Sequence, residues 1–136
     1  MNAEQIAQKW MNRCCSTIKA YDHAAHMDLI SQDIQVLGVP GYEVIGYADW
    51  FSQCEYEFNE KLIAQTSYDG LKICNSNDQQ VMFLTNETIQ STDGTMDRHP
   101  IEIVLSMEKD GQWRAIQERL LSREEAEKYG IGRGKT

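Results

Sequence analysis

The chain has 136 residues and a formal net charge of −8 at pH 7, and its length is that of a single domain. Hydrophobic residues make up 41% and charged residues 25%, a composition that argues against a disordered or membrane-embedded chain. The acidic balance also makes nucleic acid and anionic membranes unexpected partners, because both are bound through positively charged surfaces.

The first residues and the cysteines suggest where the protein works. Residues 1–5 lack the basic segment and apolar core of a signal peptide, so a cytoplasmic location is expected. Cys14, Cys15, Cys54 and Cys74 form no C-x-x-C pair, which favours reduced thiols over a zinc site. The histidines have no metal-ligand spacing either, so neither a metal nor a cofactor is expected.

Three helices and a short strand are predicted for the first half of the chain. Apolar residues recur with the 3.6 period over 3–20, and Asp22 is placed to cap a second helix over 23–30. Apolar alternation at 34–36 predicts the strand. A further apolar stripe of helical spacing after Gly46 indicates the third helix.

From about residue 62 the apolar pattern changes to the alternation typical of strands. Short sequences of Asn, Asp and Gly separate these segments, which favours hairpins between consecutive strands. The expected strands are 62–75, 79–92, 99–109 and 112–121, and residues 123–136 are expected to form a short helix and a flexible tail after one domain of residues 1–122.

Helices followed by a strand meander indicate an α+β fold. We expect three N-terminal helices packed on a curved antiparallel sheet, giving a cone with an apolar pocket between the helices and the concave sheet face. The outer sheet face is then available for a partner, and a homodimer through that face is expected.

Several short motifs in this order resemble the nuclear transport factor 2-like superfamily, which includes ketosteroid isomerase and the SnoaL-like polyketide cyclases. Residues 22–36 match, without a gap, the family's stretch that begins at the aspartate of a G-D pair. Asp22 is that aspartate, and Tyr21 replaces the usual glycine. Gly46 matches the glycine before the third helix, and the DGQW of 110–113 matches the closing hairpin. The resemblance covers residues 3–122 and implies the cystatin-like cone fold.

The resemblance does not extend to the catalytic residues of ketosteroid isomerase, which needs an aspartate base and an oxyanion hole made by a tyrosine and a protonated aspartic acid. The corresponding positions here hold Cys14, Gly38 and Ile103. A thiol, a hydrogen and an alkyl group cannot supply that base and those two donors, so this mechanism is not expected. The comparison does place Ile103 on the pocket face.

Glu118 is the candidate catalytic residue. If Asp110 and Gly111 form a two-residue turn, Ile103 pairs with Glu118 and a neighbouring pair contains Ile116 on the same, more apolar face. A carboxyl group in such surroundings has a raised pKa and can act as a general acid or base. The alternative is a strand that twists outward, so that Glu118 meets water or an arginine.

Glu87 is a second candidate with two readings. Close to Glu118 it would form a carboxylate pair in the pocket, whereas close to Arg98 or Arg119 it would form a salt bridge, which is the favoured reading. On the opposite sheet face, Glu102 and Arg119 are expected to form a cross-strand ion pair.

The histidine and aromatic candidates are less specific. His26 follows Asp22 by one helical turn, and it is read either as a catalytic histidine or, preferably, as a half-exposed helix residue. His99 begins a strand near the expected pocket mouth. The remaining candidates for the pocket wall are Tyr21, Tyr47 and Trp50.

These observations predict a pocket for a small, largely apolar molecule. If the protein is an enzyme, we expect cofactor-free acid–base chemistry of the isomerase, cyclase or dehydratase type, with Glu118 as the proton carrier. The alternative is a non-catalytic domain for ligand binding, protein interaction or dimerisation.

Overall fold

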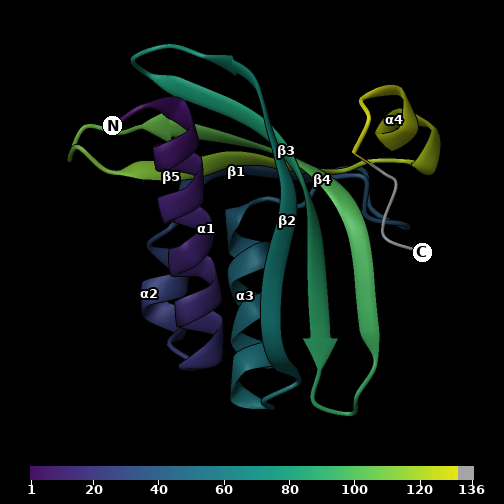
Figure 1. Ribbon diagram of the computed structural model, residues 1–136. Coiled ribbons are helices and arrows are strands. Elements are labelled where there is room, and N and C mark those ends of the chain that lie inside the picture. Colours follow the sequence, from purple (N-terminus) through teal and green to yellow (C-terminus); the bar gives the residue numbers. More distant parts are fainter. Residues whose placement is uncertain (132–136) are drawn as a thin grey trace.

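The computed structural model describes residues 1–131. Its elements follow the expected order of helices and then strands (Figure 1). They are α1 (Ala3–Lys19), α2 (His23–Met27), β1 (Ile30–Leu37), α3 (Tyr47–Asn59), β2 (Ile63–Ser76), β3 (Gln80–Ser91), β4 (Met96–Met107), β5 (Trp113–Leu120) and α4 (Arg123–Lys128).

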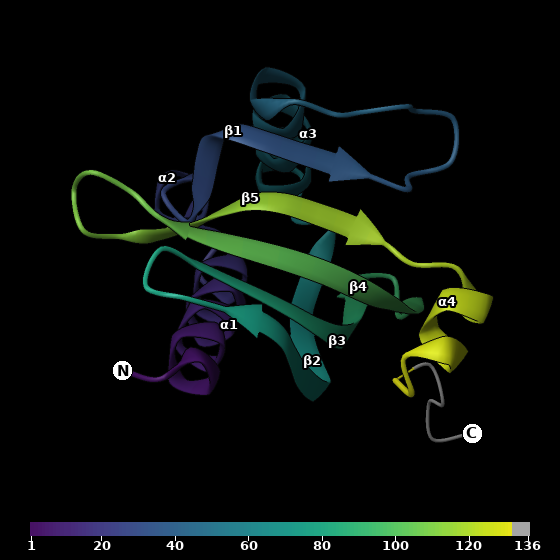
Figure 2. The ribbon, with the colours of Figure 1, turned by 90° about the horizontal axis from the view of Figure 1, so that it is seen from above.

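The strands form one sheet in the order β1-β5-β4-β3-β2 (Figure 2). Consecutive strands from β2 to β5 are antiparallel, as expected for hairpins, whereas β1 pairs with β5 in parallel. The expected antiparallel arrangement is therefore confirmed for β2 to β5, and the parallel pairing of β1 at the sheet edge is a feature that the sequence did not predict. The early strand β1 lies beside the last strand and runs in the same direction, so the sheet is mixed and the fold class is α+β.

α1, α2 and α3 lie on one side of the sheet, and α4 lies on the other (Figure 1). α1 begins with a capping box, in which Asn2 and Gln5 form reciprocal hydrogen bonds. Asp22 caps α2 as expected, but this helix ends at Met27 because the chain already enters β1 at Ile30. The apolar stripe of α1 faces the sheet, and the core includes Trp10, Met11, Cys14, Phe83, Ile103 and Leu105.

The expected short C-terminal helix is present as α4, and it covers part of the outer sheet face. Leu84 on that face is buried under Leu121, Ala126 and Ile131. The Asn86 side-chain amide donates to the Ile131 carbonyl at 2.6 Å and fixes this segment on the sheet. The expected flexible tail falls on residues 132–136, outside the described residues.

The β4–β5 hairpin differs from the expected two-residue turn. Its loop has three residues, because Glu108 and Gln112 close it with a backbone hydrogen bond of 2.9 Å, and Gly111 takes a φ of +82°. A β-bulge between the pairs Val104–Gln117 and Leu105–Ala115 then restores the expected register farther along. Ile103 pairs with Glu118 as predicted, whereas Ala115 takes the place opposite Leu105 that was expected for Ile116.

Within residues 1–131, no helix is long and apolar enough to cross a membrane.

Candidate active site

A cavity of about 1010 Å³ lies between the first three helices and the concave face of the sheet. That volume is at the upper end of the range usual for small-molecule sites. Apolar and aromatic side chains make up most of its wall, among them Trp10, Trp50, Phe58, Ile101 and Leu120. The loop after β1 contributes Tyr42 and Val44, whose exposed side chains form an apolar part of the rim.

Three polar side chains line up across neighbouring strands on the cavity wall. Tyr68 on β2 pairs with Glu87 on β3, and Glu87 pairs with His99 on β4. The Tyr68 hydroxyl donates to Glu87 Oε2 at 2.8 Å, and His99 Nε2 lies 2.8 Å from Glu87 Oε1. On the other side of the ring, His99 Nδ1 lies 3.4 Å from Asp97 Oδ2.

The two carboxyl groups beside His99 favour its protonated form. Burial alone would lower the pKa of His99, but the hydrogen bond and charge of Glu87, followed by those of Asp97, outweigh it and raise the pKa above its ordinary 6.5. For Tyr68, burial and then the charge of Glu87 raise the pKa well above 10, so the phenol stays protonated. The cluster therefore joins an imidazole whose protonated form is favoured, the Glu87 carboxyl group and a neutral phenol.

Glu118 lies on the same wall and has a different environment. Burial, followed by the negative charge of Glu87, raises its pKa from 4.5 to about 8, although the positive charge of His99 opposes this rise. It is half-buried, and it lines the cavity. Among residues 1–131 its carboxyl group has no hydrogen-bond partner, so its proton is available to a ligand.

His26 is buried and neutral. Its Nδ1 lies 3.0 Å from the Thr17 hydroxyl, and burial lowers its pKa to about 4. Asp22 is occupied by the α2 cap and accepts from the Ala25 amide, so no aspartate orients the ring. The expectation of a half-exposed His26 is wrong, because α2 packs this face against α3, where His26 lies near Phe58.

The other sequence candidates divide between the cavity and other places. Trp50, Glu87, His99, Glu118 and His26 line it, whereas Ile103 is fully buried in the core beneath it. The favoured salt bridge of Glu87 with Arg98 or Arg119 is not formed. Arg98 pairs with Asp69, Arg119 pairs with Glu102 at 3.2 Å as expected, and Glu87 is bound to Tyr68 and His99.

Ile116 and Tyr21 do not line the cavity. Ile116 is the residue at the β-bulge, and it is Ala115 that is buried in the core at this point. Tyr21 has a φ of +54°, the left-handed conformation that glycine adopts most readily. Its ring lies under Lys61, whose Nζ is 5.5 Å from the ring centroid.

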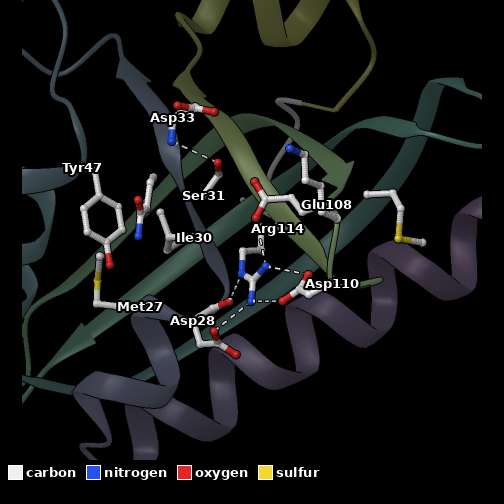
Figure 3. A pocket seen from close by; sticks show the side chains of 12 residues that line it. Met27, Asp28, Ile30, Ser31, Asp33, Tyr47, Glu108, Asp110 and Arg114 are labelled. Atoms are coloured by element: carbon white, nitrogen blue, oxygen red, sulfur yellow. Dashed lines mark hydrogen bonds and ion pairs between the residues drawn. The ribbon is translucent and has the colours of Figure 1, made fainter.

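Tyr47 lines a second, more polar hollow of about 740 Å³ at the other end of β1 (Figure 3). Its charged centre is Arg114, which contacts Asp28 at 3.0 Å, Glu108 at 2.9 Å and Asp110 at 2.8 Å. These contacts connect the β4–β5 hairpin to the end of α2, and they occupy the hydrogen-bond donors of the guanidinium group. We assign this hollow a structural role.

Sequence reasoning missed Tyr68. Two register shifts between β2 and β3 lie between the turn and the Tyr68–Glu87 pair, so simple counting from the turn puts another residue opposite Glu87. The Glu87–His99 pair could have been predicted from the sequence, because β3 and β4 pair without a register shift. Finding it requires a three-residue turn over 92–94, which the Ser91–Thr95 backbone hydrogen bond of 2.8 Å closes.

Among the described residues, no group of three or more His, Cys, Asp or Glu side chains is arranged to hold a metal ion. Burial also raises the pKa of the Cys14 thiol, which therefore stays protonated beside the cluster. The cavity wall therefore contains the hydrogen-bonded Glu87–His99 pair and a carboxyl group, Glu118, that has no hydrogen-bond partner among residues 1–131.

No protein-family model matches the sequence, and no curated protein matches it either. Solved structures do match. A nuclear transport factor 2-like protein from Cytophaga hutchinsonii has a TM-score of 0.71 and 15% identity over 90% of this chain and 99% of its own. The chain has the nuclear transport factor 2-like fold.

Two further structures with this fold have names that refer to chemistry or a gene. A protein from Novosphingobium aromaticivorans, provisionally named a scytalone dehydratase, has a TM-score of 0.67 and 14% identity over 86% of this chain and 81% of its own. ActVI-ORFA from Streptomyces coelicolor has a TM-score of 0.69 and 12% identity over 87% of this chain and 95% of its own. At such identities the likeness establishes the nuclear transport factor 2-like fold but not an activity.

Proposed function

We propose that this protein is a cofactor-free acid–base enzyme of the isomerase, cyclase or dehydratase type that acts on a small, largely apolar molecule in the large cavity. The observation that carries the proposal is the state of Glu118, a desolvated carboxyl group with no hydrogen-bond partner among residues 1–131 in an apolar wall. A group with a pKa near the working pH is the most effective proton carrier.

The other polar groups of the cluster suit supporting roles. The Tyr68 proton is directed at Glu87, and both His99 nitrogens face carboxylates, so Glu118 is the member that is available to a substrate. In its ionised form Glu118 accepts a proton from a carbon next to a carbonyl group. The positive charge of His99 stabilises the enolate that forms, and the protonated Glu118 then delivers the proton elsewhere.

The dehydratase name of one structural neighbour supports this class of chemistry without establishing it here. Loss of a hydroxyl group next to an enolate needs the same two elements, a base for carbon and an acid for the leaving oxygen. The rival function is a binding domain that uses the cavity without catalysis, and an acid that has a raised pKa and no hydrogen-bond partner among residues 1–131 argues against it.

Exchange of carbon-bound hydrogen tests the proposal without knowledge of the natural substrate. The probe is 2-tetralone, an apolar ketone, incubated with the protein in D₂O, and the loss of its α-proton signals is followed by NMR. We expect the wild-type protein to accelerate exchange and Glu118→Gln to reduce that rate by about a hundredfold, the usual contribution of one general base.

The matched control is Glu102→Gln, because Glu102 lies on the opposite sheet face in an ion pair with Arg119. This variant should exchange 2-tetralone at the wild-type rate. Exchange at the buffer rate with wild-type protein, or equal rates in the two variants, would contradict the proposed function.

We further infer a homodimer through the outer sheet face and a cytoplasmic location. In support of the location, Cys14, Cys15, Cys54 and Cys74 are free thiols. In support of the dimer, the first three helices leave the outer sheet face uncovered, and α4 protects only the part around Leu84.

A further inference from the structure

We propose that the cavity selects apolar amines, and that an amine binds with its ammonium group on the Glu118 carboxylate. The inference deepens the proposed function by naming the chemical class of the ligand, and it rests on that function only in placing the ligand in the same cavity. Three observations lead to it: the charges of the wall, the unpaired carboxyl and the aromatic lining.

The charged groups of the cavity wall are nearly all acidic. Within residues 1–131, five carboxyl groups line the cavity and no lysine or arginine does. The carboxyls are Asp49, Glu57, Glu87, Asp97 and Glu118. Of these, Glu87 and Asp97 share His99, and Gln53 donates to Glu57 at 3.1 Å. An anionic ligand such as a carboxylate or phosphate would meet uncompensated negative charge on entry.

Glu118 is the acid of the sheet wall that has neither an ion-pair nor a hydrogen-bond partner among residues 1–131. Asp49 and Glu57 on α3 form no ion pair either, but Asp49 is exposed and Glu57 accepts a hydrogen bond from Gln53. The arginines of the neighbouring strand positions are engaged elsewhere, since Arg114 binds Asp28 and Asp110, and Arg119 binds Glu102 and Glu125. A carboxylate enclosed in an apolar wall is costly unless it is paired and hydrogen-bonded. A ligand ammonium supplies both the opposite charge and the hydrogen bonds.

The lining also suits the body of such a ligand. Trp10, Trp50, Phe58 and Tyr68 contribute aromatic rings to the wall, and a cation over such a ring gains additional attraction. The volume of about 1010 Å³ accommodates a bicyclic or larger apolar group. The apolar rim at Tyr42 and Val44 is where that group would enter.

Binding of an amine should release a proton. At neutral pH the free Glu118 is largely protonated, because burial raises its pKa to about 8. The groups that act on it are Glu87, His99, Cys14, Tyr68 and Cys54, and only His99 is cationic among them. An ammonium ion that pairs with the carboxylate displaces the carboxyl proton to solvent, and it leaves Glu118 in the ionised form that the proposed chemistry requires.

The test uses three ligands that share one apolar body: 2-(1-naphthyl)ethylamine, 2-(1-naphthyl)ethanol and 1-naphthylacetate. Isothermal titration calorimetry at neutral pH, in two buffers of different ionisation enthalpy, measures affinity and the number of protons released. We expect the amine to bind about tenfold or more tightly than the alcohol, as for a hydrogen bond to a charged group, and the acetate to bind most weakly. The amine alone should release close to one proton.

The variant Glu118→Gln keeps the shape of the side chain and removes its charge. It should lose the tenfold preference and the proton release while binding the alcohol with unchanged affinity, and unchanged alcohol binding also shows that the variant is folded. Equal affinities of the wild-type protein for amine and alcohol, or amine binding without proton release, would overturn the proposal.

The outcomes also separate this inference from the proposed function. If the alcohol binds and the amine has no advantage, the amine specificity fails, while hydrogen exchange of 2-tetralone can still occur. If the amine binds with proton release but 2-tetralone does not exchange, the specificity stands and the enzymatic proposal fails. If none of the three ligands binds, the amine proposal is wrong.

Discussion

At the scale of single residues, the cavity is defined by two acids with opposite tasks. Glu87 is bound by two hydrogen-bond partners, Tyr68 and His99, and its side chain is 13% exposed. Glu118 has no such partners among the described residues and keeps its proton. The same side-chain type is therefore locked in hydrogen bonds in one position and is free to exchange its proton in the other.

Glu118 should make stability depend on pH. Its pKa is about 8 in the folded protein against an ordinary 4.5, so between these values the unfolded chain has lost a proton that the folded one retains. Raising the pH through this window therefore favours unfolding, by at most about 1.4 kcal/mol per pH unit. Urea unfolding of wild-type protein and Glu118→Gln across the window should show this loss in the wild type and a slope reduced by that amount in the variant. Parallel slopes would show that Glu118 titrates normally.

The charge on His99 should depend on Glu87. Glu87→Gln removes the charge of the closer of its two carboxyl neighbours, so less opposes the effect of burial and the pKa of His99 should fall, as followed by the imidazole NMR signals. Asp97→Asn is the comparison, because Asp97 lies farther away at 3.4 Å and its side chain is 71% exposed. Its effect should be the smaller one, and the reverse order would contradict the proposed cluster.

At the scale of elements, the turn after β1 depends on a close approach between strands. Gly38 has a φ of +83°, and a Cβ at this position would lie 2.5 Å from the Leu120 carbonyl oxygen of β5. This is also the position at which the isomerase resemblance would place a base. The backbone of β5 therefore leaves no room for the side chain of a base at this position. The candidate acid of the cavity is Glu118 instead.

Gly38→Ala should consequently be more harmful than an alanine at Gly41. Both glycines have left-handed backbones, with φ of +83° and +88°, but nothing lies within 4 Å of a Cβ at Gly41. Thermal unfolding should show a loss of roughly 1 kcal/mol for Gly41→Ala from backbone strain alone. The loss for Gly38→Ala should be larger by about 1–3 kcal/mol, because β5 must also move. Equal losses would mean that the strands do not approach as described.

The elements were largely predictable from sequence because their signals are local. The helical stripes, the Asp22 cap and the strand alternation each depend on residues close in the chain. The Ile103–Glu118 pair was also correct, although for an incomplete reason: the turn is one residue longer than assumed, and the bulge at Ile116 compensates. The parallel pairing of β1 and the Tyr68–Glu87 contact depend on distant pairings and register shifts, which no local pattern specifies.

At the scale of the whole molecule, the net charge disfavours self-association, whereas the outer sheet face favours it. The net charge of −8 repels a second copy, while the outer sheet face carries a row of half-buried or buried side chains from Met82, Val104 and Gln117 beside the Glu102–Arg119 pair. α4 and the segment that follows it cover the neighbouring Leu84, so the available patch is the central part of this face. Association through the patch should therefore be limited by repulsion between the whole chains.

This balance predicts a dimer that strengthens with salt. Raising the ionic strength from about 0.01 M to about 0.1 M shortens the screening length from about 30 Å to about 10 Å and weakens the repulsion. Sedimentation velocity at micromolar concentration should then show the 15.6 kDa chain shifting toward a species of twice that mass. Met82→Lys, which places a charge in the patch, should keep the chain monomeric. Tyr56→Lys makes the same change in charge at a site on α3 that is 58% exposed, and it should leave the dimer intact. A wild-type protein that sediments as one chain at both salt concentrations would contradict the dimer.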